Sequence, residues 1–233
     1  MSQASRRRKP QDLHRGADDR AGDLRIIGGK FRGSKLSSEP FIQATGDTQG
    51  ELVTRPMKHR VREAIFNLVG LDAKGKHAID VFAGTGALGL EAISRGATSA
   101  TFIERHVPTG DVVRRNIEAL GLQDSCELLI ASAFVWSKRD LPKPDAVSKA
   151  NGAPWLMFVS PPYVFFVDRQ EEMLALVKAL IEHAPAGSVI VVESDERFDF
   201  GLLPGGVRTD RHSDGWDVRP YSPAVVGVWR KAD

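Results

Sequence analysis

The chain has 233 residues, of which 42% are hydrophobic, and a formal net charge of +2. This content supports a hydrophobic core and excludes a disordered chain, and no apolar run approaches the ~18 residues of a membrane helix. The single cysteine, Cys126, excludes an internal disulfide, and the start of the chain lacks a signal-peptide pattern. We therefore expect a cytoplasmic protein with no membrane partner, and a monomer.

The charge is distributed unevenly along the chain. Residues 1–62 contain 14 Lys and Arg against 7 Asp and Glu, a net charge of +7, whereas residues 63–233 contain 18 against 23, a net charge of −5. A basic end on an acidic body is typical of a nucleic-acid-facing segment attached to a catalytic domain, although a short basic run is also common in solvated tails. Residues 1–23 are polar and without periodicity, so we expect a disordered basic tail there.

Two short elements are expected after this tail. RIIGGKFRGSKL, residues 25–36, interleaves basic and apolar residues around glycines, as a β-hairpin does. Thr54-Arg55-Pro56 is a helix-start signal, and Val61 and Ile65 follow it at helical spacing. We therefore assign residues 24–70 to an N-terminal hairpin and helix that face nucleic acid.

Strands and helices alternate from residue 78 onward. Apolar strands that alternate with helices indicate a Rossmann-like α/β fold, in which a mostly parallel, seven-stranded sheet carries helices on both faces. Residues 137–154 are polar and contain prolines, so we expect a surface loop or an insertion there. The expected helices are residues 87–96, 112–121 and 171–184, and the expected strands are residues 78–82, 99–104, 126–131, 155–160, 188–194, 206–211 and 224–230.

A glycine loop follows the first of these strands. Gly84, Gly86 and Gly89 have the GxGxxG spacing of nucleotide-binding loops, and Glu104 lies 20 residues after Gly84, where a carboxylate can bind ribose hydroxyls. The charge of Asp80, just before the loop, would repel a pyrophosphate but attract a ligand with an ammonium and a sulfonium group, such as S-adenosylmethionine. This disfavours a nicotinamide-dependent oxidoreductase. The simpler alternative is that Asp80 only accepts hydrogen bonds from nearby backbone N–H groups.

The sequence FVSPPYVFF, residues 158–166, ends another expected strand. Its two prolines lack the N–H groups of a sheet ladder, so Ser160 should be the last strand residue. On proline content alone the segment is a rigid loop. Phe165 and Phe166 are more typical of core packing than of stacking on a base.

These motifs together resemble a known family. DVFAGTGALGLEA, followed by FIE, is similar to the cofactor loop of class I methyltransferases, and SPPY stands where their [DNS]-P-P-[YFW] motif stands. RIIGGKFRGSKL, TRPMKHRVREAIFNLVG and DVFAGTGALGLEAISRGA, in this order, resemble the bacterial methyltransferases that modify guanine N2 in 16S ribosomal RNA. The resemblance covers about residues 24–230 without 137–154, and it makes residues 71–233 the methyltransferase domain.

The resemblance implies an S-adenosylmethionine-dependent enzyme that acts on small-subunit ribosomal RNA, within an assembling 30S particle. Its motifs carry over onto three groups of residues, and no metal site is expected because the histidines lack ligand spacing. The cofactor would be held by Asp80, Phe82, Ala83, Gly84, Thr85, Gly86, Glu104, Arg105, Ser132 and Ala133. RNA would be contacted by Arg25, Lys30, Arg32, Arg55, Arg60 and Arg62, with ordering of the site as the alternative role of the last three. Catalysis would depend on Ser160, Pro161, Pro162 and Tyr163.

Three residues depart from the family pattern. Ser132 stands where an acidic residue often meets the adenine amine, His59 replaces a usual Asp, and Ser160 replaces the commoner Asp before the prolines. In the expected chemistry the Ser160 oxygen and a nearby backbone carbonyl accept hydrogen bonds from the guanine amine, while Tyr163 stacks on the base. Serine should stabilise the developing cationic amine less than aspartate does unless a nearby carboxylate compensates, and we expect Ser160→Asp to keep or raise activity.

Other functions stay open on the sequence alone. SPPY-type motifs also occur in DNA amino-methyltransferases, although no separate target-recognition domain is visible in this chain. The serines at positions 132 and 160 keep open a non-catalytic RNA-binding protein with the same fold. Glu193, at the end of the strand expected at 188–194, is assigned a structural rather than a catalytic role.

Overall fold

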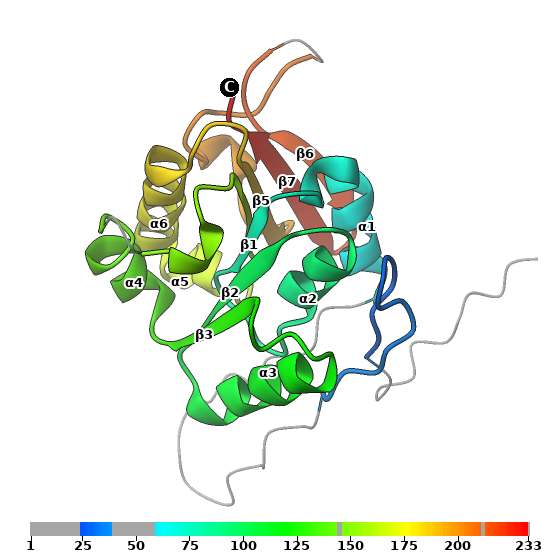
Figure 1. The fold of residues 1–233 in the computed structure, drawn as a ribbon. Coiled ribbons are helices and arrows are strands. Elements are labelled where there is room, and N and C mark those ends of the chain that lie inside the picture. Colours follow the sequence, from blue (N-terminus) through cyan, green and yellow to red (C-terminus); the bar gives the residue numbers. More distant parts are fainter. Residues whose placement is uncertain (1–23, 39–58, 144–145, 211–212, 233) are drawn as a thin grey trace, which may run out of the picture.

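A seven-stranded sheet forms the centre of the molecule, in a computed structural model that describes residues 24–38, 59–143, 146–210 and 213–232 (Figure 1). The strand order is β3-β2-β1-β4-β5-β7-β6, with β7 antiparallel to both of its neighbours and the other pairs parallel. This confirms the expected Rossmann-like sheet. The strands are β1 His77–Asp80, β2 Ser99–Glu104, β3 Cys126–Ile130, β4 Trp155–Val159, β5 Val189–Asp195, β6 Asp217–Tyr221 and β7 Ala224–Arg230.

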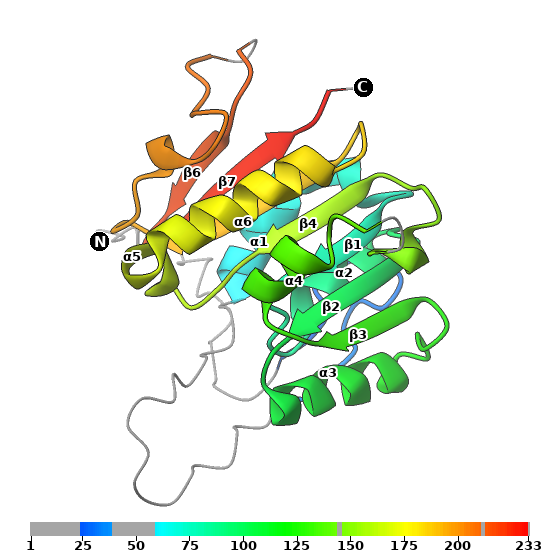
Figure 2. The same ribbon diagram turned by 90° about the vertical axis from the view of Figure 1, so that its left-hand side faces the viewer.

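Helices cover both faces of this sheet (Figure 2). One face carries α1 His59–Val69, α2 Ala87–Ser94 and α3 Val107–Ala119, and the other carries α4 Ala133–Arg139, α5 Phe165–Asp168 and α6 Gln170–His183. Short 3₁₀ helices lie at η1 Gly70–Ala73, η2 Ser148–Ala150 and η3 Phe200–Leu202. Within the described residues, no helix is long and apolar enough to cross a membrane.

The alternation of side chains along the strands produces two separate cores. In β4, Leu156 and Phe158 join the cluster under α1, α2 and α3, whereas Met157 and Val159 join the cluster under α4 and α6. Successive strand residues point to opposite faces, so a strand buried on both sides must be apolar throughout. This explains the uninterrupted apolar runs of the central strands.

The reversal of strand order lies between β1 and β4. Asp80 at the end of β1 is in register with Phe158 of β4, and the Val81 N–H donates to the Phe158 carbonyl at 3.0 Å. In open α/β sheets the crevice beyond the carboxyl ends of the strands at such a point is where ligands bind. The loop after β1 and the loop after β4 therefore border one crevice.

The N-terminal hairpin is confirmed in a small form. Its two arms are joined by an isolated antiparallel bridge between Arg25 and Lys35, and the Leu36 N–H donates to the Leu24 carbonyl at 2.7 Å. Ile26 and Leu36 are buried in the same hydrophobic cluster as α1 and the central strands. The hairpin thus packs onto the sheet and its helices through a shared core.

Two sequence predictions need correction. The sixth strand was expected at 206–211, but β6 lies at Asp217–Tyr221, because its mixed composition with Pro220 suits an exposed edge strand rather than an apolar one. Residues 137–154 were expected as a surface loop. The first three of these residues instead complete α4, and Leu141 and Val147 are buried in the core, while the other described residues up to β4 form turns and η2.

Candidate active site

The crevice gathers the loops that follow four parallel strands. Asp80 ends β1, Glu104 ends β2, Ser132 follows β3 and Ser160 follows β4. These strands run in the same direction, so all four side chains lie at the same edge of the sheet. A hollow of about 480 Å³ near Ser99 and Lys149 lies at the opposite, amino-terminal edge and does not belong to this site.

The three glycines of the loop after β1 are required for different structural reasons. Gly84 and Gly86 have φ angles of 54° and 77°, a left-handed conformation that other residues seldom adopt. A Cβ at Gly89 would overlap the Phe102 ring of β2, so this glycine permits α2 to pack closely on the sheet. A Cβ at Gly84 would meet no atom within 4 Å. The backbone at Gly84 therefore borders open space within the crevice.

Asp80 has one engaged and one unengaged carboxylate oxygen. Its Oδ2 accepts a hydrogen bond from the Gly89 N–H at 3.1 Å, while its buried Oδ1 has no partner among the described residues. Burial raises the pKa of Asp80 to about 7, with the Gly89 N–H opposing the rise and Glu104 adding to it. The capping role is thus present, and an acceptor oxygen is left for a further donor such as an ammonium group.

Glu104 holds the glycine loop from the neighbouring strand. Its carboxylate accepts hydrogen bonds from the Gly84 N–H at 3.0 Å and from the His106 N–H at 2.9 Å. Each oxygen keeps a second lone pair for a ligand hydroxyl. The adjoining Arg105, expected at the cofactor, is exposed to solvent.

The remaining cofactor candidates border an aromatic cluster. The Phe82 ring lies 5.9 Å from the Phe134 ring and 6.2 Å from the Phe165 ring, between centroids. Ser132 is the N-cap of α4 and its carbonyl accepts from the Trp136 N–H at 2.9 Å, while Ala133 is buried in the first turn. The Arg169 guanidinium lies 4.0 Å from the Phe134 centroid. Phe165 and Phe166 both pack against the core, as expected.

The loop after β4 meets a carboxylate that the sequence did not single out for chemistry. The hydroxyls of Ser160 and Tyr163 both donate to Glu193, which lies at the adjacent end of β5. Glu193 is 2% exposed, and burial raises its pKa while the two hydroxyl donors oppose the rise. Burial, and secondly Glu193, also raises the pKa of Tyr163. The signal that could have revealed Glu193 was its place at a strand end next to β4.

The expected RNA-contacting residues divide into exposed and buried ones. Arg25, Lys30, Arg32 and Arg60 are exposed, and Arg55 lies outside the described residues. Arg62 is only 1% exposed, and its guanidinium donates to the Arg25 carbonyl and lies 4.0 Å from the Glu91 carboxylate. We therefore replace the expected RNA contact of Arg62 with a role inside the protein, because a buried side chain does not reach RNA.

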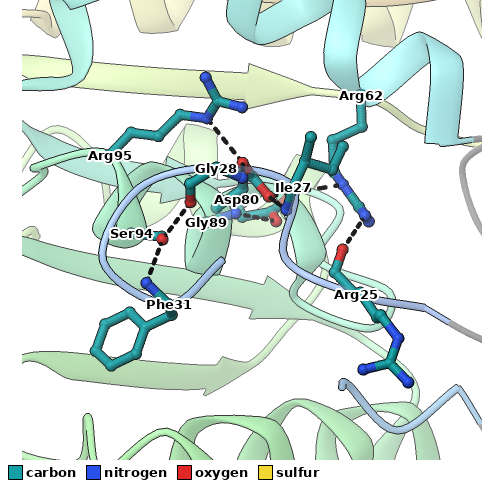
Figure 3. Close-up of polar contacts among 10 residues, drawn as sticks. Arg25, Ile27, Gly28, Phe31, Arg62, Asp80, Gly89, Ser94 and Arg95 are labelled. Atoms are coloured by element: carbon teal, nitrogen blue, oxygen red, sulfur yellow. Dashed lines mark hydrogen bonds and ion pairs between the residues drawn. The ribbon is translucent and has the colours of Figure 1, made fainter. Parts of the chain in front are cut away.

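Glu91 and Ser94 of α2 hold the hairpin on the body. Figure 3 shows the hairpin residues Ile27, Gly28 and Phe31 beside Ser94. The Glu91 carboxylate accepts hydrogen bonds from the Ile27 and Gly28 N–H groups at 2.7 and 2.8 Å, and from Arg95 Nε at 2.7 Å. The Ser94 hydroxyl accepts from the Phe31 N–H at 2.9 Å and donates to the Gly28 carbonyl. The hairpin is therefore held by polar contacts from two successive turns of one helix.

Asn116 connects the end of the hairpin segment to the glycine loop. Its side-chain NH₂ donates to the Thr85 carbonyl at 2.9 Å and to the Ser37 carbonyl at 3.1 Å, and its carbonyl oxygen accepts from the Ser37 N–H at 2.6 Å. Asn116 is 1% exposed, so these hydrogen bonds take the place of the hydrogen bonds that its side chain would form with water. Thr85 is thus fixed through its backbone.

The strand order, with β7 antiparallel and a glycine loop after β1, is that of the class I methyltransferase fold. The chain belongs to the family described as Conserved hypothetical protein 95, whose family model matches residues 24–213.

Relatives with assigned names agree with this class. YlbH of Bacillus subtilis, which carries the provisional name of an rRNA methyltransferase, is 29% identical over 210 residues, or 89% of this chain and 99% of that protein. Ribosomal RNA small subunit methyltransferase D of Escherichia coli is 40% identical over 100 residues, or 43% of this chain and 46% of that protein. A solved RNA methyltransferase from Salinibacter ruber, in complex with S-adenosyl-L-homocysteine, shares the fold with a TM-score of 0.52 and 17% identity, and covers 77% of this chain and 95% of that one.

Proposed function

We propose that this protein transfers a methyl group from S-adenosylmethionine to the exocyclic N2 amine of a guanine in 16S ribosomal RNA. The observation that carries the proposal is the pairing of β1 with β4, which brings the glycine loop and the Ser160-Pro161-Pro162-Tyr163 segment to one crevice. A methyl donor held by the glycine loop and a base held by the segment after β4 would face each other. The names of the rRNA-modifying relatives support an RNA substrate.

The residues of the loop after β1 fit S-adenosylmethionine. The unpartnered Asp80 Oδ1 can accept from the ammonium group, and the open space at Gly84 leaves room for a ligand against the backbone. Glu104 can accept from the ribose hydroxyls, and Phe82, Ser132 and Ala133 would border the adenine. When bound, S-adenosylmethionine supplies an electrophilic methyl group on a sulfonium.

The segment after β4 would activate the amine. The guanine N2 lone pair is delocalised into the ring, so the amine needs acceptors for its two hydrogens that leave the lone pair aimed at the methyl carbon. The Ser160 oxygen and a backbone carbonyl beside Pro161 can provide them. So held, the amine would accept the methyl group from the sulfonium, with the C–S electron pair left on sulfur and one amine proton released to water. Half-buried Tyr163 would stack on the base.

The hairpin would contact the RNA. Its exposed cations Arg25, Lys30 and Arg32 lie on the segment that Glu91 of α2 holds, and Arg60 is exposed on α1. Such cations bind phosphates without reading sequence, so they would position the substrate rather than select the base.

Methyl-transfer mapping tests the proposal. The protein would be incubated with labelled S-adenosylmethionine and either under-methylated 30S particles or protein-free 16S RNA, and the labelled base identified by mass spectrometry. We expect N2-methylguanine, with the particle as the better substrate. Label on adenine or cytosine, or on DNA supplied as a competitor, would contradict the guanine assignment. A protein that binds no S-adenosylmethionine in calorimetry would instead be a non-catalytic RNA-binding protein.

A further inference from the structure

Glu193 is a buried acid that the methyl-transfer step above does not use. It lies one strand away from Ser160, because Val159 of β4 is in register with Val192 of β5. Among the described residues, the hydrogen bonds to its carboxylate come from the SPPY segment, through the hydroxyls of Ser160 and Tyr163. No Lys or Arg of the described residues forms an ion pair with it.

The direction of these hydrogen bonds determines what Ser160 can offer a substrate. A serine hydroxyl has one hydrogen and two acceptor lone pairs. Because the hydrogen is donated to Glu193, the Ser160 oxygen can present only lone pairs to the crevice. A hydroxyl donating to a carboxylate is also a stronger acceptor than an isolated hydroxyl, since hydrogen bonds in a chain polarise one another.

We propose that Glu193 is a positioning residue for methyl transfer: it orients the Ser160 hydroxyl as an acceptor for the target amine and places a negative charge behind it. This inference rests on the proposed function. Serine and glutamate together then do what a single aspartate before the two prolines would do, with the charge one hydrogen bond farther from the amine. The charge has no basic partner in the described structure, so it is available to the amine as that group becomes cationic.

The proposal changes the expectation for Ser160→Asp. A carboxylate at position 160 would lie against the Glu193 carboxylate, and two such groups cannot both stay ionised at this separation. The substitution alone should therefore reduce methyl transfer rather than maintain it. Removing the second charge with Glu193→Gln should restore an aspartate that acts directly.

The test is a double-mutant cycle on full-length protein, with under-methylated 30S particles and labelled S-adenosylmethionine. Glu193→Gln should lower kcat about 10- to 100-fold with less than a threefold change in KM for the particle, because glutamine carries no charge behind Ser160 and offers one acceptor oxygen to two hydroxyl donors. Ser160→Asp/Glu193→Gln should be at least tenfold more active than Glu193→Gln. Exposed Glu182→Gln on α6 is the matched control and should keep wild-type kcat.

The possible results distinguish a failure of the positioning role of Glu193 from a failure of the proposed methyl transfer. A wild-type enzyme that methylates no guanine defeats the proposed function itself, whatever the variants do. Wild-type kcat in Glu193→Gln, or a double variant no more active than Glu193→Gln, overturns the positioning role and points to a structural one. If Glu193→Gln fails to fold, Ser160→Ala and Ser160→Asp decide the question: both should lose at least tenfold in kcat, and full activity in either overturns the proposal.

Discussion

The Arg62 guanidinium lies 4.0 Å from the Glu91 carboxylate, with the two side chains 1% and 0% exposed. The same carboxylate accepts two backbone N–H groups of the hairpin and pairs with Arg95 at 2.7 Å, so its charge is shared between two ion pairs and a docking contact. Burial lowers the pKa of Arg62 and Glu91 opposes this change. The cation thus depends on its partner for compensation inside the protein.

Removal of the Glu91 charge should therefore be costly. Glu91→Gln leaves the buried Arg62 without a counter-charge, and we expect a loss of about 3–5 kcal/mol in the free energy of unfolding, measured by urea denaturation. The control is Asp111→Asn, which breaks an exposed pair with Arg114 and should cost less than about 1 kcal/mol. Similar losses in the two variants would show that the buried pair contributes no more to the free energy of unfolding than the exposed pair does.

Two glycines of the hairpin provide a test of its docking. A Cβ at Gly29 would overlap the Ser94 carbonyl, whereas a Cβ at Gly33 meets nothing within 4 Å, and the φ angles are 77° and 85°. Both alanine variants bear the cost of a left-handed backbone, about 1 kcal/mol. Only Gly29→Ala should also release the hairpin, seen as faster amide hydrogen exchange at Ile26 and Leu36. Equal exchange in the two variants would argue against a tightly seated hairpin.

Gly84→Ala should weaken cofactor binding with little further effect on folding. Its φ of 54° resembles the 66° of Gly121, which follows α3 away from the crevice, and neither Cβ would meet protein atoms within 4 Å. The two alanine variants should thus lose similar stability. Calorimetry with S-adenosylmethionine should show at least tenfold weaker binding in Gly84→Ala alone, because its methyl group enters the ligand space. Unchanged affinity would place the cofactor elsewhere.

Asp80 should make stability fall as the pH rises. Its pKa is about 7 in the folded protein against 3.8 without burial, so between these values the folded state binds more protons than the unfolded state. The Asp80→Asn variant lacks this effect. As the pH rises from 5 to 8, its free energy of unfolding should therefore increase by about 2–3 kcal/mol relative to that of the wild type. His77, whose pKa burial lowers to about 4, contributes in the opposite direction but equally in both proteins. Urea denaturation at the two pH values measures the difference, and a constant difference would refute the pKa.

Tyr163 has a hydroxyl and a ring with separable roles. Tyr163→Phe removes one of the two donors to Glu193 but keeps the ring, and we expect less than a tenfold loss in kcat. Tyr163→Ala also removes the stacking surface and should lose at least 100-fold, with a higher KM for the RNA substrate. Methyl-transfer assays on the two variants distinguish these effects. Full activity in Tyr163→Ala would exclude base stacking by this residue.

The features that followed from the sequence are those encoded locally. The sequence predicts a strand at 99–104, and β2 lies at Ser99–Glu104. An apolar run bounded by turn residues predicts a strand even when the neighbouring strands of the sheet are not known. The glycine loop was readable for the same reason. Glu193 was not, since its contact with Ser160 joins residues 33 apart and depends on which strands are neighbours. The burial of Arg62 also needed the fold, because its partner Glu91 lies on another helix.

The helix α2 joins the two ends of the site as one short rod. It has eight residues, all buried, and so is about 12 Å long. Gly86 of the cofactor loop is its N-cap, and Glu91 and Ser94 in its second half hold the hairpin. A fully buried helix has little room to bend, so a displacement of the glycine loop at its N-cap would also displace Glu91 and Ser94. The position of the hairpin is therefore tied to the position of the glycine loop through about one and a half turns of buried helix, from Gly86 to Glu91.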